Sequence, residues 1–351
     1  MTQAYEWIAR LLQAMRGRRI AVIGDLMLDE WYWGTVRRIS PEAPVPVVEV
    51  DDHTYTLGGA GNVANNLAAL GAKVSVFGVI GTDEAGDRLL ALFARLGVDA
   101  GHVARLPARP TTQKMRIVAH NQQVVRADRE ATEPVPDGVR QRLARALAQL
   151  DGKLDGVIVS DYGKGLVART LVQAVRGFSR PPVIAADPKP QNLDAFLGVD
   201  WIAPNVGEAQ SAAGITIKSD ADLARAAKIL MERTRARHVL VTRGEHGMSL
   251  FSKTEKPLWV PALARQVYDV SGAGDTVMST LTLALAAKAT MAQAVTLANL
   301  AAGVVVEKLG TATASPKEIL AFAEHRGVQQ PRRSKTAPKK TPRKKPSRAR
   351  H

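Results

Sequence analysis

Short apolar runs alternate with amphipathic segments along most of this 351-residue chain, and this alternation limits its possible folds more than any other feature. The apolar runs, which have the length and composition of buried strands, are 19–24, 74–79, 156–160, 183–186 and 238–242. The segments with helical periodicity are 5–15, 60–70, 84–96, 137–150, 166–177, 219–234, 274–288, 291–308 and 315–325. Strands and helices that alternate in this way build a parallel sheet with helices on both faces. We therefore predict a doubly wound α/β fold.

Two segments, 31–57 and 111–128, interrupt this alternation. In the first, residues 45–50 alternate in polarity and contain prolines, which is typical of an edge strand. The second contains two short β-like runs, 114–118 and 123–128, separated by a turn. Strands inserted beside the carboxyl edge of a sheet commonly form a lid, and we predict a small β lid here.

Most of the positive charge lies in a tail. The formal net charge is +15, but eleven Lys or Arg and no acidic residue lie between Arg326 and His351, so the first 325 residues carry only +4. The tail also lacks apolar residues to bury, which predicts one α/β domain over 1–326 and a disordered tail over 327–351. Such a tail favours non-specific contact with nucleic acid. It lacks the aromatic residues that stack on bases, so a nucleic-acid-binding protein remains the less favoured alternative.

Several function classes are excluded by what the sequence lacks. There is no cysteine, which excludes disulfides, thiolate catalysis and Cys-ligated metals. The sequence contains no P-loop, no His-Glu-x-x-His and no Gly-x-Ser-x-Gly motif. No apolar run reaches 18 residues and no signal-peptide pattern opens the chain, so we expect no membrane span and a cytoplasmic location.

The strongest chemical motif is Asp269-Val-Ser-Gly-Ala-Gly-Asp275, which opens an apolar helical run. Small residues before a helix leave amide groups bare, and the helix dipole adds positive potential there, so the amides of Gly272, Ala273 and Gly274 predict an anion site. Asp275 in the first helical turn is placed to take a proton from a hydroxyl beside that anion. The alternative is a tight turn followed by a favourable first-turn acid.

A second glycine motif, Gly58-Gly-Ala-Gly-Asn62, also opens a helix. Residues 59–64 fit the dinucleotide fingerprint Gly-x-Gly-x-x-Ala, with Asp83 about twenty residues later. The preceding segment 51–56 is polar, although that fingerprint needs a buried strand. A dinucleotide-dependent oxidoreductase is therefore one alternative. The other is backbone contact at Gly59 with a polyhydroxy ligand, with Asn62 as donor and acceptor.

Two carboxylates follow the first predicted strand, in Gly24-Asp25-Leu-Met-Leu-Asp29. Carboxylates at the carboxyl end of a strand suit binding of sugar hydroxyls, and we favour Asp29 for this role. Helix caps or turn acids are the alternative, and this reading applies more to Asp25.

Two further motifs suit a nucleotide and its metal ion. Asn205 and Glu208 follow the strand-like residues 201–204, and their oxygens can orient a hydrated Mg²⁺ through its waters. The same spacing is that of a helix capping box. The second motif is a Gly-rich turn that suits nucleotide phosphates, although turn chemistry alone also explains it. Its candidate residues are Thr242, Arg243, Gly244 and Gly247.

In this order, the motifs resemble the ribokinase-like (PfkB) family of carbohydrate kinases. Residues 58–62 and 272–275 are similar to that family's two signatures, and 205–208 lies between them. The resemblance spans about residues 18–325 and departs at Val270, where the second signature usually has Thr. It implies ATP-dependent phosphorylation of a sugar, a Mg²⁺ requirement and a homodimer whose lid strands meet across a two-fold axis.

Within this family, several stretches are similar to the kinases of D-glycero-D-manno-heptose 7-phosphate. They are 40–46, 112–116, 121–128, 160–165 and 269–276. This similarity implies phosphorylation of O1 to the 1,7-bisphosphate, for ADP-heptose and lipopolysaccharide core biosynthesis. Many such kinases carry a fused nucleotidyltransferase with a His-x-Gly-His motif, which is absent here, so a stand-alone kinase is expected. A family member acting on ribose, fructose or a nucleoside remains the alternative.

The resemblance assigns roles to the candidate residues. Asp275 would be the base on O1, the three amides would stabilise the transferred group, and Asn205 with Glu208 would orient Mg²⁺. The residues expected to bind sugar hydroxyls are Asp29, Gly59 and Asn62. The cations expected to bind the distal phosphate are Lys114, Arg116, Arg126 and Lys164. Strand alternation places Lys114 and Arg116 on one face, although solvated surface charges are the alternative.

Overall fold

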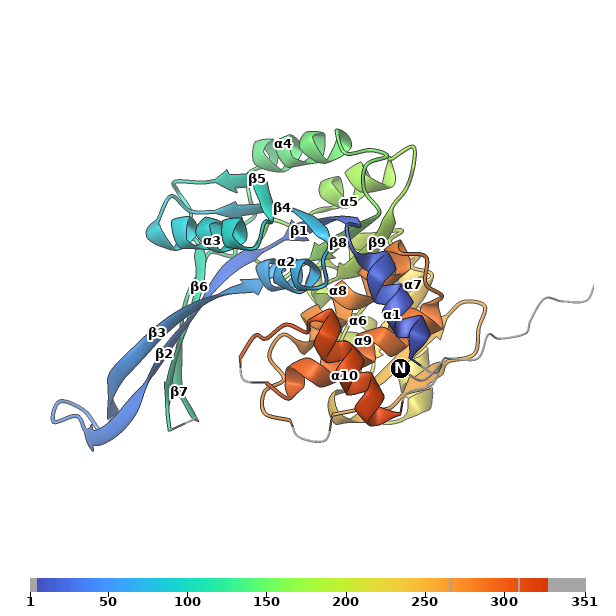
Figure 1. The fold of residues 1–351 in the computed structure, drawn as a ribbon. Coiled ribbons are helices and arrows are strands. Elements are labelled where there is room, and N and C mark those ends of the chain that lie inside the picture. The colour runs from blue at the N-terminus through green and yellow to red at the C-terminus, as the bar shows by residue number, and fades with distance from the viewer. Residues whose placement is uncertain (1–4, 121, 265–266, 309, 328–351) are drawn as a thin grey trace, which may run out of the picture.

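The computed structural model describes residues 5–120, 122–264, 267–308 and 310–327. Within these residues the main sheet has nine strands, and its strands from β11 to β5 are parallel (Figure 1). In sheet order they are β13 (Leu258–Val260), β12 (Met248–Ser252), β11 (His238–Thr242), β10 (Trp201–Ile202), β9 (Val183–Asp187), β8 (Gly156–Ser160), β1 (Arg19–Gly24), β4 (Lys73–Ile80) and β5 (Asp99–Arg105). The predicted tail lies, from residue 328 onward, outside the described residues.

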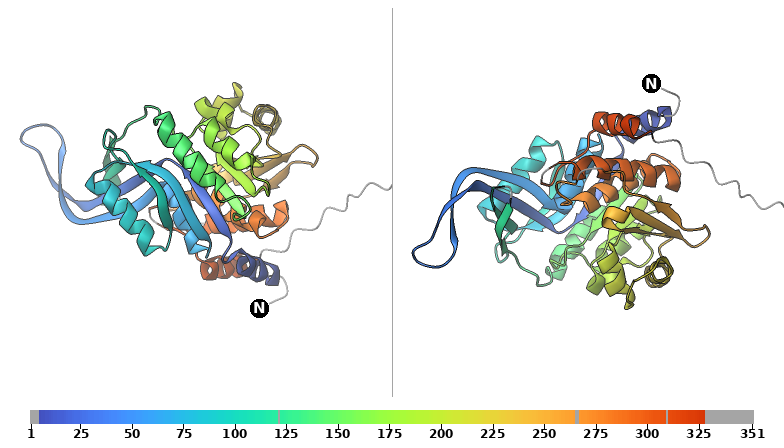
Figure 2. Two further views of the ribbon diagram at one scale, coloured as in Figure 1. Left: turned by 90° about the horizontal axis from the view of Figure 1, so that it is seen from above. Right: turned by 90° about the horizontal axis from the view of Figure 1, so that it is seen from below.

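Helices cover both faces of this sheet, so the predicted doubly wound α/β fold is confirmed (Figure 2). One face packs against α1 (Glu6–Met15), α2 (Ala60–Ala69), α3 (Glu84–Arg95), α8 (Ala273–Ala286), α9 (Met291–Val306) and α10 (Pro316–Arg326). The other packs against α4 (Asp137–Ala148), α5 (Arg169–Arg176), α6 (Val206–Ala213) and α7 (Asp220–Thr234). Strand alternation explains the two cores, since Ile20 and Val22 of β1 enter the first and Ala21 and Ile23 enter the second. No helix in the described part of the chain has the length and hydrophobicity to span a bilayer.

A second sheet of four strands projects from one end of the molecule (Figure 1). Its order is β3 (Pro46–Gly59), β2 (Leu26–Ile39), β6 (Thr112–Ala119) and β7 (Gln122–Arg129). We call this sheet the lid. It is built from the two segments that interrupt the α/β alternation, but β2 and β3 are much longer than the single edge strand predicted for 45–50. β2 is buried at its start and exposed at its end, so no single alternation pattern runs along it.

The lid joins the main sheet at the carboxyl end of β1. A Cβ on Gly24 would lie 2.1 Å from the carbonyl oxygen of Ser160, so only glycine allows β1 and β8 to approach so closely here. At the other root of the lid, Gly59 has φ +54°, and a Cβ there would lie 2.7 Å from the carbonyl oxygen of Asp25. These two glycines direct β2 outward and return β3 into α2.

Some sequence expectations were wrong in detail. β5, β12 and β13 were not predicted, because edge strands such as Asp99–Arg105 carry polar residues and show no buried run. α5 begins at Arg169 rather than at 166. The context of a dinucleotide fingerprint is absent, because β3 belongs to the lid and Asp83 caps α3 by accepting a hydrogen bond from the Gly86 amide over 3.1 Å.

We predict that Gly24→Ala destabilises the protein by about 1–3 kcal/mol, because the new methyl group overpacks the junction between β1 and β8. Urea unfolding measures this. Gly138→Ala is the matched control, because a Cβ at this position in α4 meets no atom within 4 Å. It should leave stability unchanged or raise it by about 0.5–1 kcal/mol. Equal stability of the two variants would contradict the packing argument.

Candidate active site

The first turn of α8 is open toward one side and closed toward the other. Gly272 caps the helix with φ +78°, and a Cβ there would lie 2.6 Å from Asn62 Nδ2, so the position requires glycine. A Cβ on Gly274 would meet no atom within 4 Å, so the turn faces open space at that point. The amide of Ala273 donates to the carbonyl of Val270 over 3.2 Å, which leaves it less available than its neighbours. The helix dipole favours an anion at this end.

Asp275 is 8% exposed and lies among polar groups, not hydrocarbon. Asn62 Nδ2 donates to its Oδ2 over 2.7 Å, and the Tyr162 hydroxyl donates to its Oδ1 over 2.8 Å. Burial raises the pKa of Asp275 to about 6, although these two hydrogen bonds favour its ionised form. The nearby carboxylate of Asp29 raises the same pKa further. A carboxylate with a pKa near neutrality suits general-base catalysis.

Buried polar side chains hold α2 against α8 and fix this geometry. Asn66 Nδ2 donates to the carbonyl of Asn62 over 2.9 Å, and Thr276 Oγ1 donates to Asn66 Oδ1 over 2.8 Å. Farther along, Ser279 Oγ donates to the carbonyl of Val63 over 3.0 Å. These groups are satisfied inside the protein, so they position the Asn62 amide rigidly against Asp275.

Tyr162 comes from a loop that follows β8, and Asp25 anchors this loop. One Asp25 oxygen, Oδ2, accepts hydrogen bonds from the amides of Tyr162 over 2.8 Å and Lys164 over 3.0 Å, while Oδ1 accepts from Leu166 over 3.4 Å. Burial raises the pKa of Asp25, and these amides oppose the rise. The structure therefore gives Asp25 the role of a turn acid, as the alternative to sugar binding predicted. It also explains the late start of α5.

Asp29 lies at the root of the lid and pairs with a cation there. Arg116 Nη1 lies 3.0 Å from Asp29 Oδ1, and both side chains are largely buried. The guanidinium of Arg116 lies over the ring of Trp31, 4.7 Å from its centroid. A Cβ on Gly58 would lie 2.8 Å from the Asp29 carboxyl group, so the glycine makes room for this side chain. Burial raises the pKa of Asp29, and Arg116 provides the largest opposing effect.

The other predicted phosphate-binding cations share acidic partners. Lys114 Nζ lies 2.9 Å from Asp128 and 3.6 Å from Glu130, and Lys164 Nζ lies 2.6 Å from Glu130. Arg126 pairs with Asp128 over 2.9 Å and is more exposed than the two lysines. β6, β7 and the loop after β8 thus bring Lys114, Arg116, Arg126 and Lys164 into one linked cluster with Asp29. An anionic ligand would exchange places with these carboxylates.

Asn205 and Glu208 form the capping box of α6. Glu208 donates its amide to Asn205 Oδ1 over 2.9 Å, and Asn205 donates its amide to Glu208 Oε2 over 3.0 Å. Glu208 Oε1 also accepts a hydrogen bond from Lys189 Nζ over 2.6 Å. The capping alternative is therefore realised. Each carboxylate oxygen keeps a second lone pair, so contact with a metal-bound water is compatible with this arrangement.

Three residues near the site were missed by sequence reasoning, namely Tyr162, Asp187 and Lys189. Asp187 ends β9, and burial raises its pKa to about 8, with further contributions from Glu208 and Asp275. Lys189 lies 5.4 Å from the centroid of the Tyr162 ring and helps to offset the negative charge. The available signal was position, because Asp187 follows a buried strand at the same sheet edge as Asp29.

The predicted nucleotide turn follows β11. Thr242 forms an isolated parallel bridge with Asn205, so the two predicted nucleotide motifs are neighbours. A Cβ on Gly244 would meet nothing within 4 Å, whereas one on Gly247 would lie 2.1 Å from the carbonyl oxygen of Val260. Arg243 is held by Asp220 over 3.1 Å and lies over the ring of Trp259. The open part of this turn is thus the backbone at Gly244, and the Arg243 guanidinium is already engaged.

Direct metal coordination is not prepared in the described residues. No group of three or more His, Asp or Glu side chains there is arranged to hold a metal ion. The carboxylates of Asp187 and Glu208 lie close enough to raise the pKa of Asp187. Adjacent carboxylates with this mutual repulsion fit a hydrated divalent cation, bound through its waters and through nucleotide phosphates.

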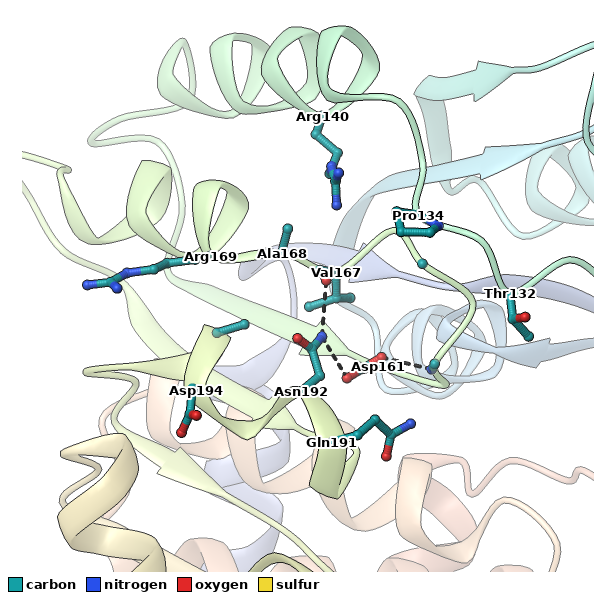
Figure 3. A pocket seen from close by; sticks show the side chains of 13 residues that line it. Thr132, Pro134, Arg140, Asp161, Val167, Ala168, Arg169, Gln191, Asn192 and Asp194 are labelled. Atoms are coloured by element: carbon teal, nitrogen blue, oxygen red, sulfur yellow. Dashed lines mark hydrogen bonds between the residues drawn. The ribbon is translucent and has the colours of Figure 1, made fainter.

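A cavity of about 590 Å³ lies beside the loop that carries Tyr162 (Figure 3). Asp161 lines it and accepts hydrogen bonds from Asn192 Nδ2 over 3.1 Å and from the Gly163 amide over 2.8 Å. None of the predicted site residues lines this cavity. Its contribution to the site is therefore indirect, through the position of the 161–165 loop.

This geometry can bind an anion at a helix start, take a proton with Asp275 and hold a second anion at the lid. The sequence pattern of pfkB family carbohydrate kinases matches residues 18–318. The chain belongs to the pfkB family of carbohydrate kinases. It is therefore an ATP-dependent carbohydrate kinase. The ribokinase-like resemblance drawn from the motifs is confirmed.

Relatives named "Bifunctional protein HldE" are similar over most of this chain. The protein from Pelobacter propionicus is 44% identical over 315 residues, which are 89% of this chain and 64% of the relative. That from Desulfatibacillum aliphaticivorans is 48% identical over 305 residues, with 86% and 62% covered. The chain thus spans less than two thirds of the length of these relatives.

Solved structures share the fold at low identity. Escherichia coli phosphofructokinase-2 in complex with substrates and products has a TM-score of 0.73 at 19% identity, covering 88% of this chain and 99% of that one. Arabidopsis thaliana ribokinase complexed with ribose and ATP has a TM-score of 0.68 at 20% identity, covering 87% and 98%. At this identity the comparison establishes the kinase fold.

We predict that Asp275→Asn lowers kcat by about 10²–10⁴, the usual range for a lost general base, while the KM for ATP changes little. The amide keeps the size of the side chain but cannot accept the proton. Steady-state kinetics with both substrates measures this. An Asn variant with near wild-type turnover would refute the assignment.

The pH profile provides an independent prediction. Because the base must be ionised, kcat/KM should fall as the pH drops through about 6. The Tyr162 hydroxyl stabilises the ionised carboxylate, so Tyr162→Phe should move this acidic limb to higher pH. A limb that stays in place in Tyr162→Phe, or that lies near pH 4 in the parent enzyme, contradicts the assignment.

Proposed function

We propose that this kinase transfers the γ-phosphoryl group of ATP to O1 of D-glycero-D-manno-heptose 7-phosphate, giving the 1,7-bisphosphate. The observation that carries this proposal is the cationic cluster of the lid, which reaches Asp29 near the base Asp275. A sugar that already carries a phosphate requires such a second anion site. The stretches similar to heptose 7-phosphate kinases and the 44–48% identity to HldE proteins support it. ADP-heptose and lipopolysaccharide core biosynthesis is the corresponding role.

In this proposal, Asp275 removes the proton from O1 as the bond between O1 and the γ-phosphorus forms. The bond to the β-phosphate oxygen breaks, and ADP leaves. Asn62 and Tyr162 keep the carboxylate oriented toward O1. The amides at the start of α8, among which Gly274 is the most open, stabilise charge on the transferred group.

The sugar lies between the base and the lid. Asp29, Asn62 and the backbone at Gly59 bind its hydroxyl groups, with Asn62 shared between the sugar and Asp275. The distal phosphate binds to the lid cations, led by Arg116 and Lys114, which are the least exposed pair of the cluster with Lys164. Phosphate binding would displace the partners Asp128 and Glu130.

The nucleotide lies over the neighbouring strand ends. Thr242 and Gly244 contact its phosphates through the turn after β11, with Arg243 and Gly247 shaping that turn. Asn205 and Glu208 hold Mg²⁺ through water, and the bound ion supplies charge neutralisation on the phosphates. A cytoplasmic location, where ATP is available, is part of the proposal.

A homodimer through the lid is also part of the proposal. The lid exposes large apolar side chains that a monomer would leave in water. They are Ile39, Val45, Val50, Val124 and Val125. A second lid packed on this sheet would cover them, as the family resemblance implies.

Direct assay tests the substrate. Purified protein, ATP, Mg²⁺ and heptose 7-phosphate should yield ADP and a bisphosphate of the expected mass. A panel of ribose, fructose, fructose 6-phosphate and a nucleoside provides the comparison. Higher kcat/KM for an unphosphorylated sugar would overturn the heptose phosphate assignment while leaving the family assignment intact.

We predict that Lys114→Ala raises the KM for the phosphorylated sugar about ten-fold to a hundred-fold and leaves the KM for ATP nearly unchanged, because one charge-assisted contact is lost. Steady-state kinetics with each substrate varied in turn measures both values. Arg37→Ala is the control, because Arg37 is an exposed cation of the same lid that pairs with Glu49 over 3.5 Å. Equal effects of Lys114→Ala on both substrates argue against a distal phosphate contact.

A further inference from the structure

A second cavity, of about 700 Å³, lies at the opposite edge of the main sheet from Asp275. Its walls come from the segments that precede parallel strands, at 152–155 before β8, 180–182 before β9, 198–200 before β10 and 235–237 before β11. Asp275, Asp29 and the nucleotide turn follow strands and lie at their carboxyl ends. The cavity is therefore separate from the candidate active site, and its size lies within the usual range for small-molecule sites.

The lining of this cavity is strongly cationic. Its basic residues are Arg18, Lys153, Arg176, Arg180, Arg235, Arg237 and Lys288, and its acidic residues are Asp155 and Asp200. The surplus of five positive charges exceeds the net charge of +4 carried by the first 325 residues. Positive charge is thus concentrated at this one place on a body that is otherwise close to neutral.

Three of these cations already have partners. Arg18 pairs with Asp155 over 3.2 Å, Arg237 pairs with Asp200, and Arg176 donates to the carbonyl of Gly198. The other four form no side-chain ion pair or hydrogen bond with any described residue. They are Lys153, Arg180, Arg235 and Lys288. These four are available to an anion.

Compensation of helix dipoles does not account for the surplus. The carboxyl ends of α5, α7 and α8 lie at this edge and carry about half a negative charge each. Asp151 also lies close, since it accepts hydrogen bonds from the amides of Ser179 and Arg180. After both contributions, a surplus of more than about two positive charges remains.

The backbone at two of the free cations supports a role for their side chains. Arg235 and Lys288 have φ of +57° and +69°, and His120 is the only other non-glycine residue with positive φ among the described residues. Both follow a helix end, where a left-handed conformation favours glycine. The backbone gains nothing from Arg or Lys at these positions, so what the two residues contribute is a cationic side chain at the cavity.

We propose that this cavity is a second binding site, for a small molecule that carries two or more phosphate groups. Its cations come from separate segments around one concavity, so a ligand with several anionic groups contacts more of them than a single phosphate does. A nucleoside diphosphate and a sugar bisphosphate share this chemistry. The proposal does not depend on the identity of the sugar substrate.

The test is binding of inorganic pyrophosphate to the full chain, measured by isothermal titration calorimetry at about 0.15 M salt, where exposed charges are screened beyond about 8 Å. The variant is Arg235→Gly with Lys288→Gly. Glycine suits both backbone conformations, so this variant should keep its melting temperature and its kinase activity. We expect its affinity for pyrophosphate at this site to fall about ten-fold or more.

Lys228→Gln with Lys317→Gln is the matched control. It removes two positive charges from exposed positions outside the cavity and should bind pyrophosphate like the parent. Any pyrophosphate held at the start of α8 is common to all three proteins. Titrations with ADP and with fructose 1,6-bisphosphate identify the source, and a loss with either one in the glycine variant supports the proposal. Identical isotherms for the three proteins with all three probes overturn it.

Discussion

The carboxylate of Asp275, held by one amide and one hydroxyl at the start of a helix, is the contact on which the site depends. Asn62, Tyr162 and Asp275 lie on three segments that meet only when the fold is complete. A buried carboxylate is costly unless its oxygens are hydrogen-bonded, and here both oxygens have a donor. Burial and these donors act in opposite directions on its pKa, which they bring to about 6.

The doubly wound sheet explains why these segments meet. Parallel strands present all their carboxyl ends at one edge, and the residues after β1, β8, β9 and β11 supply most of the site. Glycine permits the closest approaches at that edge, as Gly272 does beside Asn62. The lid extends the same edge outward, so that cations of β6 and β7 pair with an acid at the root of β2.

Much of this could be predicted from local sequence, and the remainder depends on contacts across the chain. The start of α8 was predictable because small residues, an acid and an apolar run follow one another. β2 was not, because it passes from full burial to full exposure within one strand. The roles of Tyr162 and Lys189 could not be read either, since each depends on a residue far away in sequence or on another strand end. For Asn205 and Glu208, spacing permitted both a cap and a metal role; the structure shows the cap, and the metal role stays a prediction.

The most direct measurement of the central claim is titration of the Asp275 carboxyl by ¹³C NMR, with labelled aspartate. The Asp275→Asn variant assigns the signal by its disappearance, which separates it from Asp187, whose pKa is raised to about 8. We predict that the signal lost in the variant titrates near pH 6 in the free enzyme. A lost signal that titrates near pH 4, as for a solvated aspartate, would contradict the buried, hydrogen-bonded base described above.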